Sequence, residues 1–390
     1  MKITRIELIP TSFPLRKPFV MSGARITSID SVVIKMHTDE GIVGIGETGD
    51  TSPWYIGDSQ DSVIEVIRKV VAPQIVLGED PFRIELIVAR MDYAVRHNYQ
   101  AKALIDFALH DIVGKRLGVP VYQLLGGLSQ EKIPLMKVLG AGDTTALIKE
   151  ARSALAAGFK SIKLKAAAQS LQQDVEMVKA AREALGPEVR IIIDANAGWQ
   201  YFEALEVLRQ VERYNLTYVE QPLPWWDIDG MARLRKQVRV PIFADESAVE
   251  LAQVAECIRK EAVDGFMIKI AKVGGFLKAQ KWVALAKTAG LPVTSGCFKG
   301  SGIEAATYAH FLAATEWMGR MEQGNLGPLE NFEILDTVSV DITDDLAKKL
   351  PRYEGGHIHP PHGPGLGVEL NEAVIERLVT PGKARVVLTR

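Results

Sequence analysis

Charged residues recur at nearly even intervals through the middle of this 390-residue chain, each at the end of a short apolar run. From Lys165 onward the steps are 29, 26, 25 and 24 residues, a size that fits one strand, one helix and two loops. The series consists of Lys163, Lys165, Asp194, Glu220, Asp245 and Lys269. Carboxylate oxygens are ligands that Mg²⁺ prefers, and here three carboxylates stand between lysines. The pattern therefore predicts a metal site flanked by lysines.

The direction in which these side chains point follows from strand geometry. Side chains alternate along a strand, so Lys163 and Lys165 share one face, and so do Asp194 and Asn196. We expect that face to line the interior of a barrel, where a charge is costly unless it is paired or bound to a metal. A single acid at such a position is more often the N-cap of the next helix. Three successive strands that end in acids favour Mg²⁺ binding instead.

The elements that must position this series alternate between strand and helix from about residue 131. This alternation indicates a parallel sheet, and eight units without a long break favour a closed (β/α)8 barrel with functional residues at the strand ends. The expected strands are Ile133–Val138, Ser161–Lys165, Val189–Asp194, Leu216–Glu220, Val240–Asp245, Phe266–Lys269, Pro292–Ser295 and a weak Met318–Glu322. No GxGxxG motif follows the first strand, and this absence argues against a dinucleotide-binding fold.

The chain before the barrel has a different pattern. A hairpin is expected at Ser31–Thr48, followed by helices near Asp61–Val71, near Pro81–Arg96 and at Ala101–Leu117. The predicted fold class is therefore α/β, a modified TIM (β/α)8 barrel with an N-terminal α+β capping domain. The predicted boundaries are 1–130 for the capping domain, 131–345 for the barrel and 346–390 for a C-terminal segment. That segment, with short strands at Val368–Leu370 and Ala384–Leu388, is expected to pack back on the capping domain.

Composition excludes several classes of protein. A formal net charge of −2 argues against nucleic acid as a partner, because phosphate binding needs a basic face. The sequence shows neither an apolar stretch of membrane-spanning length nor the apolar core of a signal peptide at its N-terminus. Two cysteines, Cys257 and Cys297, are too few for a disulfide framework. These features predict a cytoplasmic location.

An ordered set of motifs covers essentially the whole chain and resembles the enolase superfamily, in its mandelate racemase/muconate lactonizing enzyme branch. The motifs are DEGIVGIGET, ALIDFALHDIVGKRLGVPVYQLLGG, KLK, DANAGW, VEQP, ADES, a strand-six lysine followed by KVGG, and GPGLG. The resemblance implies a capping domain over the barrel and Mg²⁺ held by Asp194, Glu220 and Asp245. It also implies that a base removes the proton α to a substrate carboxylate and that the metal stabilises the resulting enediolate.

The same resemblance implies roles for the lysines. Lys165 and Lys269 would lie on opposite faces of the substrate, one as base and the other as acid, with Lys163 beside them. Asn196 would reach a metal-bound water or the substrate carboxylate. Strand six ends in lysine and strand seven offers no histidine, so the chain resembles the muconate lactonizing enzyme subgroup, which has lysines on both sides.

Substrate specificity is expected in two capping loops, Phe19–Thr27 and Gly49–Asp58, and in residues at the ends of the later strands. The predicted substrate-binding residues are Arg25, Trp54, Tyr55, Asn196, Ser295, Lys299 and Glu322. Packing between the domains is an equal alternative for the Trp–Tyr pair. Related cycloisomerases often carry a glutamate where Lys299 stands, which weakens the case for muconate. The Asp-x-Asp motif typical of dipeptide epimerases is missing at the expected strand eight. Its absence argues against an unblocked dipeptide as the substrate.

The predicted function is Mg²⁺-dependent abstraction of a proton α to the carboxylate of a small molecule. Two opposed lysines favour a racemase or epimerase of an amino-acid derivative, such as a proline betaine or an N-substituted amino acid. A muconate-type cycloisomerase and a hydroxyproline-type dehydratase stay open, because the same intermediate leads to all three. A non-catalytic barrel would be expected to lack a catalytic residue, and a pyridoxal enzyme would need a phosphate cradle; both rank far lower. We also expect a homo-oligomer.

Overall fold

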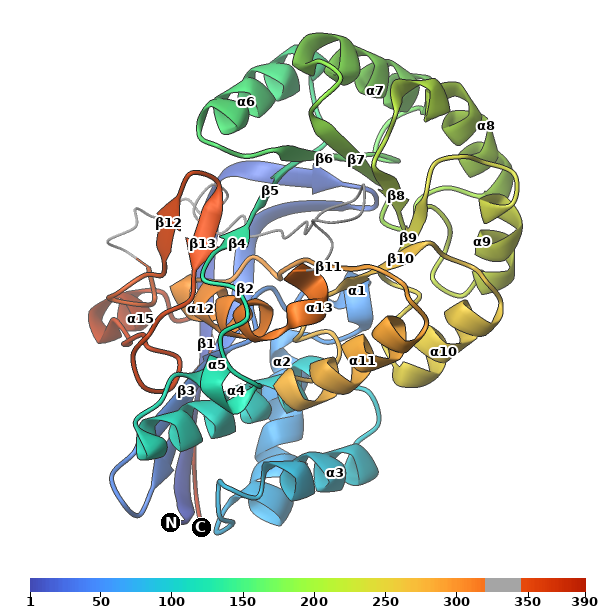
Figure 1. The fold of residues 1–390 in the computed structure, drawn as a ribbon. Coiled ribbons are helices and arrows are strands. Elements are labelled where there is room, and N and C mark those ends of the chain that lie inside the picture. The colour runs from blue at the N-terminus through green and yellow to red at the C-terminus, as the bar shows by residue number, and fades with distance from the viewer. Residues whose placement is uncertain (320–344) are drawn as a thin grey trace.

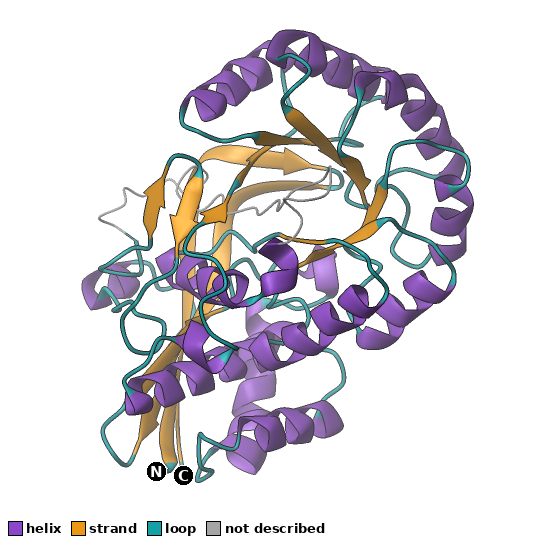
Figure 2. Cartoon of the chain, in the orientation of Figure 1, coloured by secondary structure: helices purple, strands orange, loops and turns teal. Residues whose placement is uncertain are grey.

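A computed structural model describes residues 1–319 and 345–390 of the chain. It contains a curled parallel sheet surrounded by helices and, packed against it, an antiparallel sheet with its own helices (Figures 1 and 2). This arrangement confirms the predicted α/β fold class with a capping domain. Among the described residues, no helix is long and apolar enough to cross a membrane.

The capping sheet has the strand order β14-β1-β2-β3 and is antiparallel. Strands β2 (Ala24–Thr38) and β3 (Val43–Glu47) form the predicted hairpin. Strand β1 (Ile3–Met21) was not predicted, although it pairs with β2 along nearly its whole length. Three prolines interrupt its sequence, and proline normally argues against a strand because it cannot donate to the ladder.

The three predicted helical segments of the capping domain are present. They correspond to α2 (Gln60–Val66) with the π-helix η1 (Ile67–Val76), to α3 (Ile84–Ala94) and to α4 (Tyr99–Leu117). Their apolar side chains pack with those of the capping sheet in one core. Helix α4 approaches β3 so closely that a Cβ on Gly44 would lie 2.3 Å from the carbonyl oxygen of Ala108. This glycine therefore sets the spacing between helix and sheet.

Seven parallel strands form the curled sheet, in the order β5 to β11. They are β5 (Met136–Leu139), β6 (Ser161–Lys165), β7 (Arg190–Asp194), β8 (Tyr218–Glu220), β9 (Ile242–Ala244), β10 (Gly265–Ile268) and β11 (Val293–Ser295). Helices α6 (Thr144–Ala156), α7 (Leu171–Leu185), α8 (Tyr201–Val211), α9 (Ile228–Arg235), α10 (Leu251–Arg259) and α11 (Phe276–Thr288) lie outside them (Figure 1). The spacing of the charged series thus reflects real strand–helix units.

Two predicted barrel strands differ from the structure. The segment predicted as one strand at Ile133–Val138 splits into β4 (Ile133–Pro134) and β5, and β4 pairs antiparallel with β13 (His357–His359). A proline ends β4, which removes a backbone donor at that point. The start of the predicted eighth strand lies in helix α13 (Glu316–Gly319), and its remainder falls outside the described residues.

A layer of apolar side chains inside the curled sheet supports the charged residues. Met136, Ile192, Tyr218 and Phe243 form a separate buried cluster contributed by β5, β7, β8 and β9. The rings of Tyr218 and Phe243 stack with centroids 4.1 Å apart. Because side chains alternate, residues two positions further along these strands project on the same side. The strand ends that carry the charged series therefore lie next to a layer of packed apolar side chains inside the sheet.

The C-terminal segment lies against the capping sheet and the barrel. It contains β12 (Arg352–Glu354), β13, α15 (Glu372–Arg377) and β14 (Val386–Thr389). Strand β14, close to the predicted strand at Ala384–Leu388, pairs antiparallel with β1, so the two chain termini lie side by side (Figure 1). The strand predicted at Val368–Leu370 is wrong: that segment makes only an isolated bridge from Leu370 to Ala347. The domain boundaries stay a prediction.

Candidate active site

The charged series meets at the carboxyl ends of consecutive strands. Lys165 of β6 is the register partner of Asp194 of β7, and Asp194 is the partner of Glu220 of β8. Lys165 Nζ lies 2.5 Å from Asp194 Oδ2, and Lys163 Nζ lies 2.6 Å from Glu220 Oε2. These side chains are almost fully buried. The parity argument from the sequence therefore places both lysines correctly on the face that carries the acids.

Asn196 is held in the same cluster by its backbone as well as its side chain. Its φ angle is +43°, in the left-handed region that asparagine tolerates better than most residues. The backbone N–H of Asn196 donates to Asp194 Oδ1 at 2.9 Å, and its Oδ1 accepts from Lys165 Nζ at 3.0 Å. Lys165 is thus oriented by two barrel residues that follow the same strand.

Asp245, directly after β9, is the most heavily bonded carboxylate of the cluster. It accepts from Lys269 Nζ at 2.8 Å, from Lys272 Nζ at 2.7 Å and from the hydroxyl of Tyr55 at 2.5 Å. Burial alone would raise the pKa of Asp245, but the two lysines lower it below its ordinary value. Asp245 is therefore a fixed negative charge between two ammonium groups.

The acids also repel one another. Burial, with the negative charge of Asp194 next, raises the pKa of Glu220 to about 7 despite its contact with Lys163. Burial and the charge of Asp245 raise the pKa of Glu246 to about 8. Glu246 Oε2 is buried without a hydrogen-bond partner, while its Oε1 accepts from Asn196 Nδ2 at 3.2 Å. Two of the four acids at the strand ends, Glu220 and Glu246, therefore hold a proton more tightly than a free carboxyl group does.

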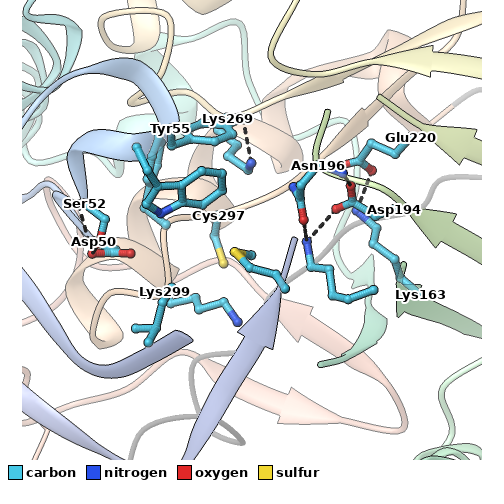
Figure 3. Close-up of a pocket in the computed structure, with 15 residues that line it drawn as sticks. Asp50, Ser52, Tyr55, Lys163, Asp194, Asn196, Glu220, Lys269, Cys297 and Lys299 are labelled. Carbon is cyan, nitrogen blue, oxygen red and sulfur yellow. Dashed lines mark hydrogen bonds and ion pairs between the residues drawn. The ribbon is translucent and has the colours of Figure 1, made fainter. Parts of the chain in front are cut away.

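A cavity lies between this cluster and the capping domain (Figure 3). Its lining includes both lysines of β6, the acids of β7 and β8, and Lys269. The capping domain and the β11–α12 loop complete the wall with Met21, Ile26, Asp50, Ser52, Trp54, Tyr55, Cys297, Phe298 and Lys299. One end of the cavity is thus charged and the rest is largely apolar or aromatic, which is typical of a small-molecule site.

Buried hydrogen bonds fix the capping wall to the barrel. Glu47, at the end of β3, accepts from both the backbone N–H and the hydroxyl of Ser301, which precedes helix α12 (Gly302–Ala314). The backbone N–H of Asp50 donates to the carbonyl of Phe298 at 2.6 Å. Burial raises the pKa of Glu47 to about 7. The loop that carries Lys299 is therefore tied to the strand that leads into the Trp54 loop.

The structure brings most of the predicted site residues together. Trp54, Tyr55, Asn196 and Lys299 line the cavity, as do the three lysines. Arg25, by contrast, is exposed near the tip of the β1–β2 hairpin and does not line it. Ser295 is buried and donates to the neighbouring carbonyl of Gly296. Glu322 lies outside the described residues.

Sequence reasoning missed one lysine of the cluster and part of the wall. Lys272 is fully buried and donates to the carboxylate and carbonyl of Asp245 and to the carbonyl of Met267. A second lysine three residues after Lys269, within an apolar stretch, was the available signal. Asp50 also lines the cavity, and burial raises its pKa to about 6. It follows a strand of the other domain, so strand-end spacing within the barrel could not identify it.

The donor set suits a hard cation, although the three acids do not converge on a single point. Among the described residues, no three Asp, Glu, His or Cys side chains converge on one point as metal ligands. Each acid of the series instead bonds to a lysine. The all-oxygen donors on three neighbouring strand ends, and the orphaned oxygen of Glu246 beside them, nevertheless fit Mg²⁺ chemistry.

Comparison with known proteins identifies the family. Residues 3–126 match the model of the mandelate racemase / muconate lactonizing enzyme N-terminal domain, and residues 146–374 match the enolase C-terminal domain-like model. The chain belongs to the mandelate racemase/muconate lactonizing enzyme family. A crystal structure of a family protein from Azoarcus sp. EbN1 is 50% identical over 100% of both chains, with a TM-score of 0.92.

Several relatives with named activities are isomerases. An N-succinyl-L-Arg/Lys racemase from Bacillus cereus is 33% identical over 379 residues, which is 97% of this chain and 98% of that protein. A chloromuconate cycloisomerase from Cupriavidus pinatubonensis is 31% identical over 379 residues, 96% of this chain and 97% of that protein. The chain is therefore an isomerase of this family, as predicted from its motifs.

Proposed function

We propose that this protein racemises or epimerises an amino-acid derivative by moving the proton α to its carboxylate. The observation that carries the proposal is the placement of two lysines on opposite sides of one acidic cluster. Lys165 ends β6 and Lys269 follows β10, and the strands between them supply the acids. Both lysines line the same cavity. A proton taken by one lysine and returned by the other inverts the α-carbon.

Asp194, Glu220 and Asp245 are the residues that would hold Mg²⁺ in this proposal. The bound ion would supply positive charge next to the substrate carboxylate, where negative charge develops as the α-proton leaves. Two of the three acids also hold the reactive lysines, Asp194 at Lys165 and Asp245 at Lys269. The acids therefore fix the lysines at the substrate as well as providing oxygen ligands.

Two lysines of the cluster share the same local electrostatics. Burial would lower the pKa of Lys269, but Asp245 and Glu246 raise it above its ordinary value. Burial opposes charge on Lys163 in the same way, and Glu220 and Asp194 raise its pKa. In this state Lys269 is therefore suited to donate a proton, and Lys163 to remain a fixed cation beside Glu220.

The wall of the cavity supports a substrate with a substituent on its amino group. Trp54, Met21 and Ile26 offer apolar surface, and Lys299 provides a positive charge on the same wall. The relative from Bacillus cereus is named for N-succinyl arginine and lysine, and an L-Ala-D/L-Glu epimerase from Clostridium acetobutylicum is 31% identical over 360 residues. We therefore place N-acylated amino acids first among the substrates to be tested.

Cycloisomerisation of a muconate is the second candidate. The relatives include chloromuconate cycloisomerases at 31% identity, close to the values for the racemase and the epimerase. The position of Lys299 in the wall, where related cycloisomerases often have a glutamate, places this reaction second. A hydroxyproline-type dehydration would use the same first step.

The shared first step can be tested directly. Purified protein with Mg²⁺ is incubated in D₂O with the separate enantiomers of N-succinyl-arginine, N-succinyl-lysine and proline betaine, and α-deuteration is followed by ¹H NMR. We expect exchange together with racemisation, and loss of racemisation in both Lys165→Met and Lys269→Met. Lys278→Met, on a surface lysine of α11, is the matched control. Lactone formation from cis,cis-muconate without exchange of the amino-acid derivatives would overturn the proposal in favour of the second candidate.

A further inference from the structure

One capping side chain reaches into the cluster at the strand ends. The hydroxyl of Tyr55 donates to Asp245 Oδ1 at 2.5 Å and accepts from Lys269 Nζ at 2.7 Å. Lys269 Nζ also lies 2.8 Å from Asp245 Oδ2 and 3.9 Å from the centroid of the Tyr55 ring. A single phenol therefore bridges the acid after β9 and the lysine after β10, and its ring lies against the ammonium group. Figure 3 shows Tyr55 beside Lys269.

The position of Tyr55 is fixed from both domains. It lies in the short helix α1 (Pro53–Ile56), which ends at Gly57 with a φ of +86°. Asp50 supports the start of this helix by accepting from the backbone N–H and the hydroxyl of Ser52. On the barrel side the ring packs edge-on against Phe298, with centroids 5.5 Å apart. The hydroxyl is thus aimed at Lys269 by packing.

The two opposed lysines are therefore oriented in different ways. Lys165 bonds to Asp194 and Asn196, which both belong to the barrel. Lys269 bonds to Asp245 of the barrel and to Tyr55 of the capping domain. A shift of helix α1 would leave the contacts of Lys165 with Asp194 and Asn196 intact and would break the contact of Lys269 with Tyr55. The capping domain therefore contacts the Lys269 side of the site directly, through Tyr55.

We propose that Tyr55 is a positioning residue for Lys269. In the arrangement of the capping domain seen here, it completes one of the two proton-transfer positions. This role rests on the proposed racemase or epimerase function. The phenol hydroxyl is already shared by Asp245 and Lys269, so it serves the protein's own groups and not the polar groups of the substrate. Removing it should impair proton transfer on the Lys269 side much more than on the Lys165 side.

The decisive experiment measures the two sides separately. Tyr55→Phe removes one oxygen atom, and Tyr99→Phe is the matched control, because the hydroxyl of Tyr99 also donates from the capping domain to a barrel carboxylate, Glu250, at 2.6 Å. The enantiomers of N-succinyl-arginine are incubated singly in D₂O with Mg²⁺, and the initial rate of α-deuteration is recorded for each. Lys269→Met identifies the enantiomer whose proton Lys269 removes.

In Tyr55→Phe we expect exchange of that enantiomer to fall about tenfold or more, the loss expected for one charge-assisted hydrogen bond. Exchange of the other enantiomer should change by less than about threefold, and Tyr99→Phe should leave both rates near those of wild type. Equal losses for the two enantiomers, or no loss in either, would overturn the positioning role. Melting curves of both variants verify that they are folded.

A second measurement tests the contact without turnover. Urea unfolding of wild type, Tyr55→Phe, Lys269→Met and the double variant, all in EDTA, forms a double-mutant cycle. We expect the double variant to be more stable than the sum of the single effects predicts, because each substitution removes the same interaction. Additive effects would overturn the bridge itself. Wild-type protein that exchanges neither enantiomer would instead overturn the proposed function on this substrate, and the cycle would still decide whether the bridge exists.

Discussion

Replacing Lys272 by methionine should destabilise the barrel far more than replacing Lys278, a partly exposed lysine of the following helix. Lys272 is fully buried, and its ammonium group donates to the carboxylate of Asp245 at 2.7 Å, to the carbonyl of Asp245 at 2.8 Å and to the carbonyl of Met267 at 2.9 Å. Methionine fills a similar volume, so the loss is one of charge and donors rather than of packing.

The expected loss in the free energy of unfolding follows from the groups that Lys272→Met leaves without a partner. Two backbone carbonyls lose a buried donor, and an unsatisfied buried polar group costs about 1–3 kcal/mol. Asp245 keeps its bonds to Lys269 and Tyr55, so its charge is not left unpaired. With two such carbonyls, the total loss in the free energy of unfolding should therefore be about 2–6 kcal/mol.

The assay is urea unfolding in EDTA, followed by tryptophan fluorescence. Lys278→Met is the control, because Lys278 pairs with Asp92 at 3.0 Å but both side chains are partly exposed. Such a surface pair contributes about 0–1 kcal/mol. If Lys272→Met lost no more stability than Lys278→Met, the cluster would not depend on its buried lysine as the structure implies.

Three further outcomes are expected. Mg²⁺ should raise the melting temperature of the wild type saturably, and should do so much less in Asp194→Asn, as measured by differential scanning fluorimetry. Burial raises the pKa of Glu47 from 4.5 to about 7, so the folded protein binds this proton more tightly than the unfolded chain. The stabilisation is therefore present below pH 4.5 and is lost as the pH rises through 7; Glu47→Gln should weaken that pH dependence in urea titrations at several pH values. Gly44→Ala should cost about 1–3 kcal/mol by overpacking against helix α4, whereas Gly142→Ala, whose Cβ would meet open space, should be near neutral in the same titrations.

The periodic part of the fold could be predicted from the sequence, and the irregular parts could not. Strand β6 matches its predicted range, and the following strands differ by a few residues at their ends, because buried parallel strands give continuous apolar runs. Strand β1 was missed because prolines interrupt its pattern. The first barrel strand was misjudged because local sequence cannot show that β4 pairs with a strand more than two hundred residues later.

The candidate site was predictable where its residues follow strands of one sheet. Parity and spacing placed Lys163, Lys165 and Asp194 on one face, and the structure shows them bonded to their neighbours there. The capping wall was predicted less well. Arg25 is exposed, whereas Asp50 lines the cavity, because the contact between two separately folded units depends on their packing and leaves no periodic signal.

The charges of the cluster explain why each acid of the series lies beside a lysine. When all are ionised, the four acids Asp194, Glu220, Asp245 and Glu246 face the four lysines Lys163, Lys165, Lys269 and Lys272, so the buried layer is close to neutral. A divalent cation among the acids must compete with ammonium groups for the same oxygens. A carboxylate that enters with the cation offsets part of the added charge. Metal and substrate should therefore reinforce each other's binding, because each acid of the series also has a cationic partner within the protein.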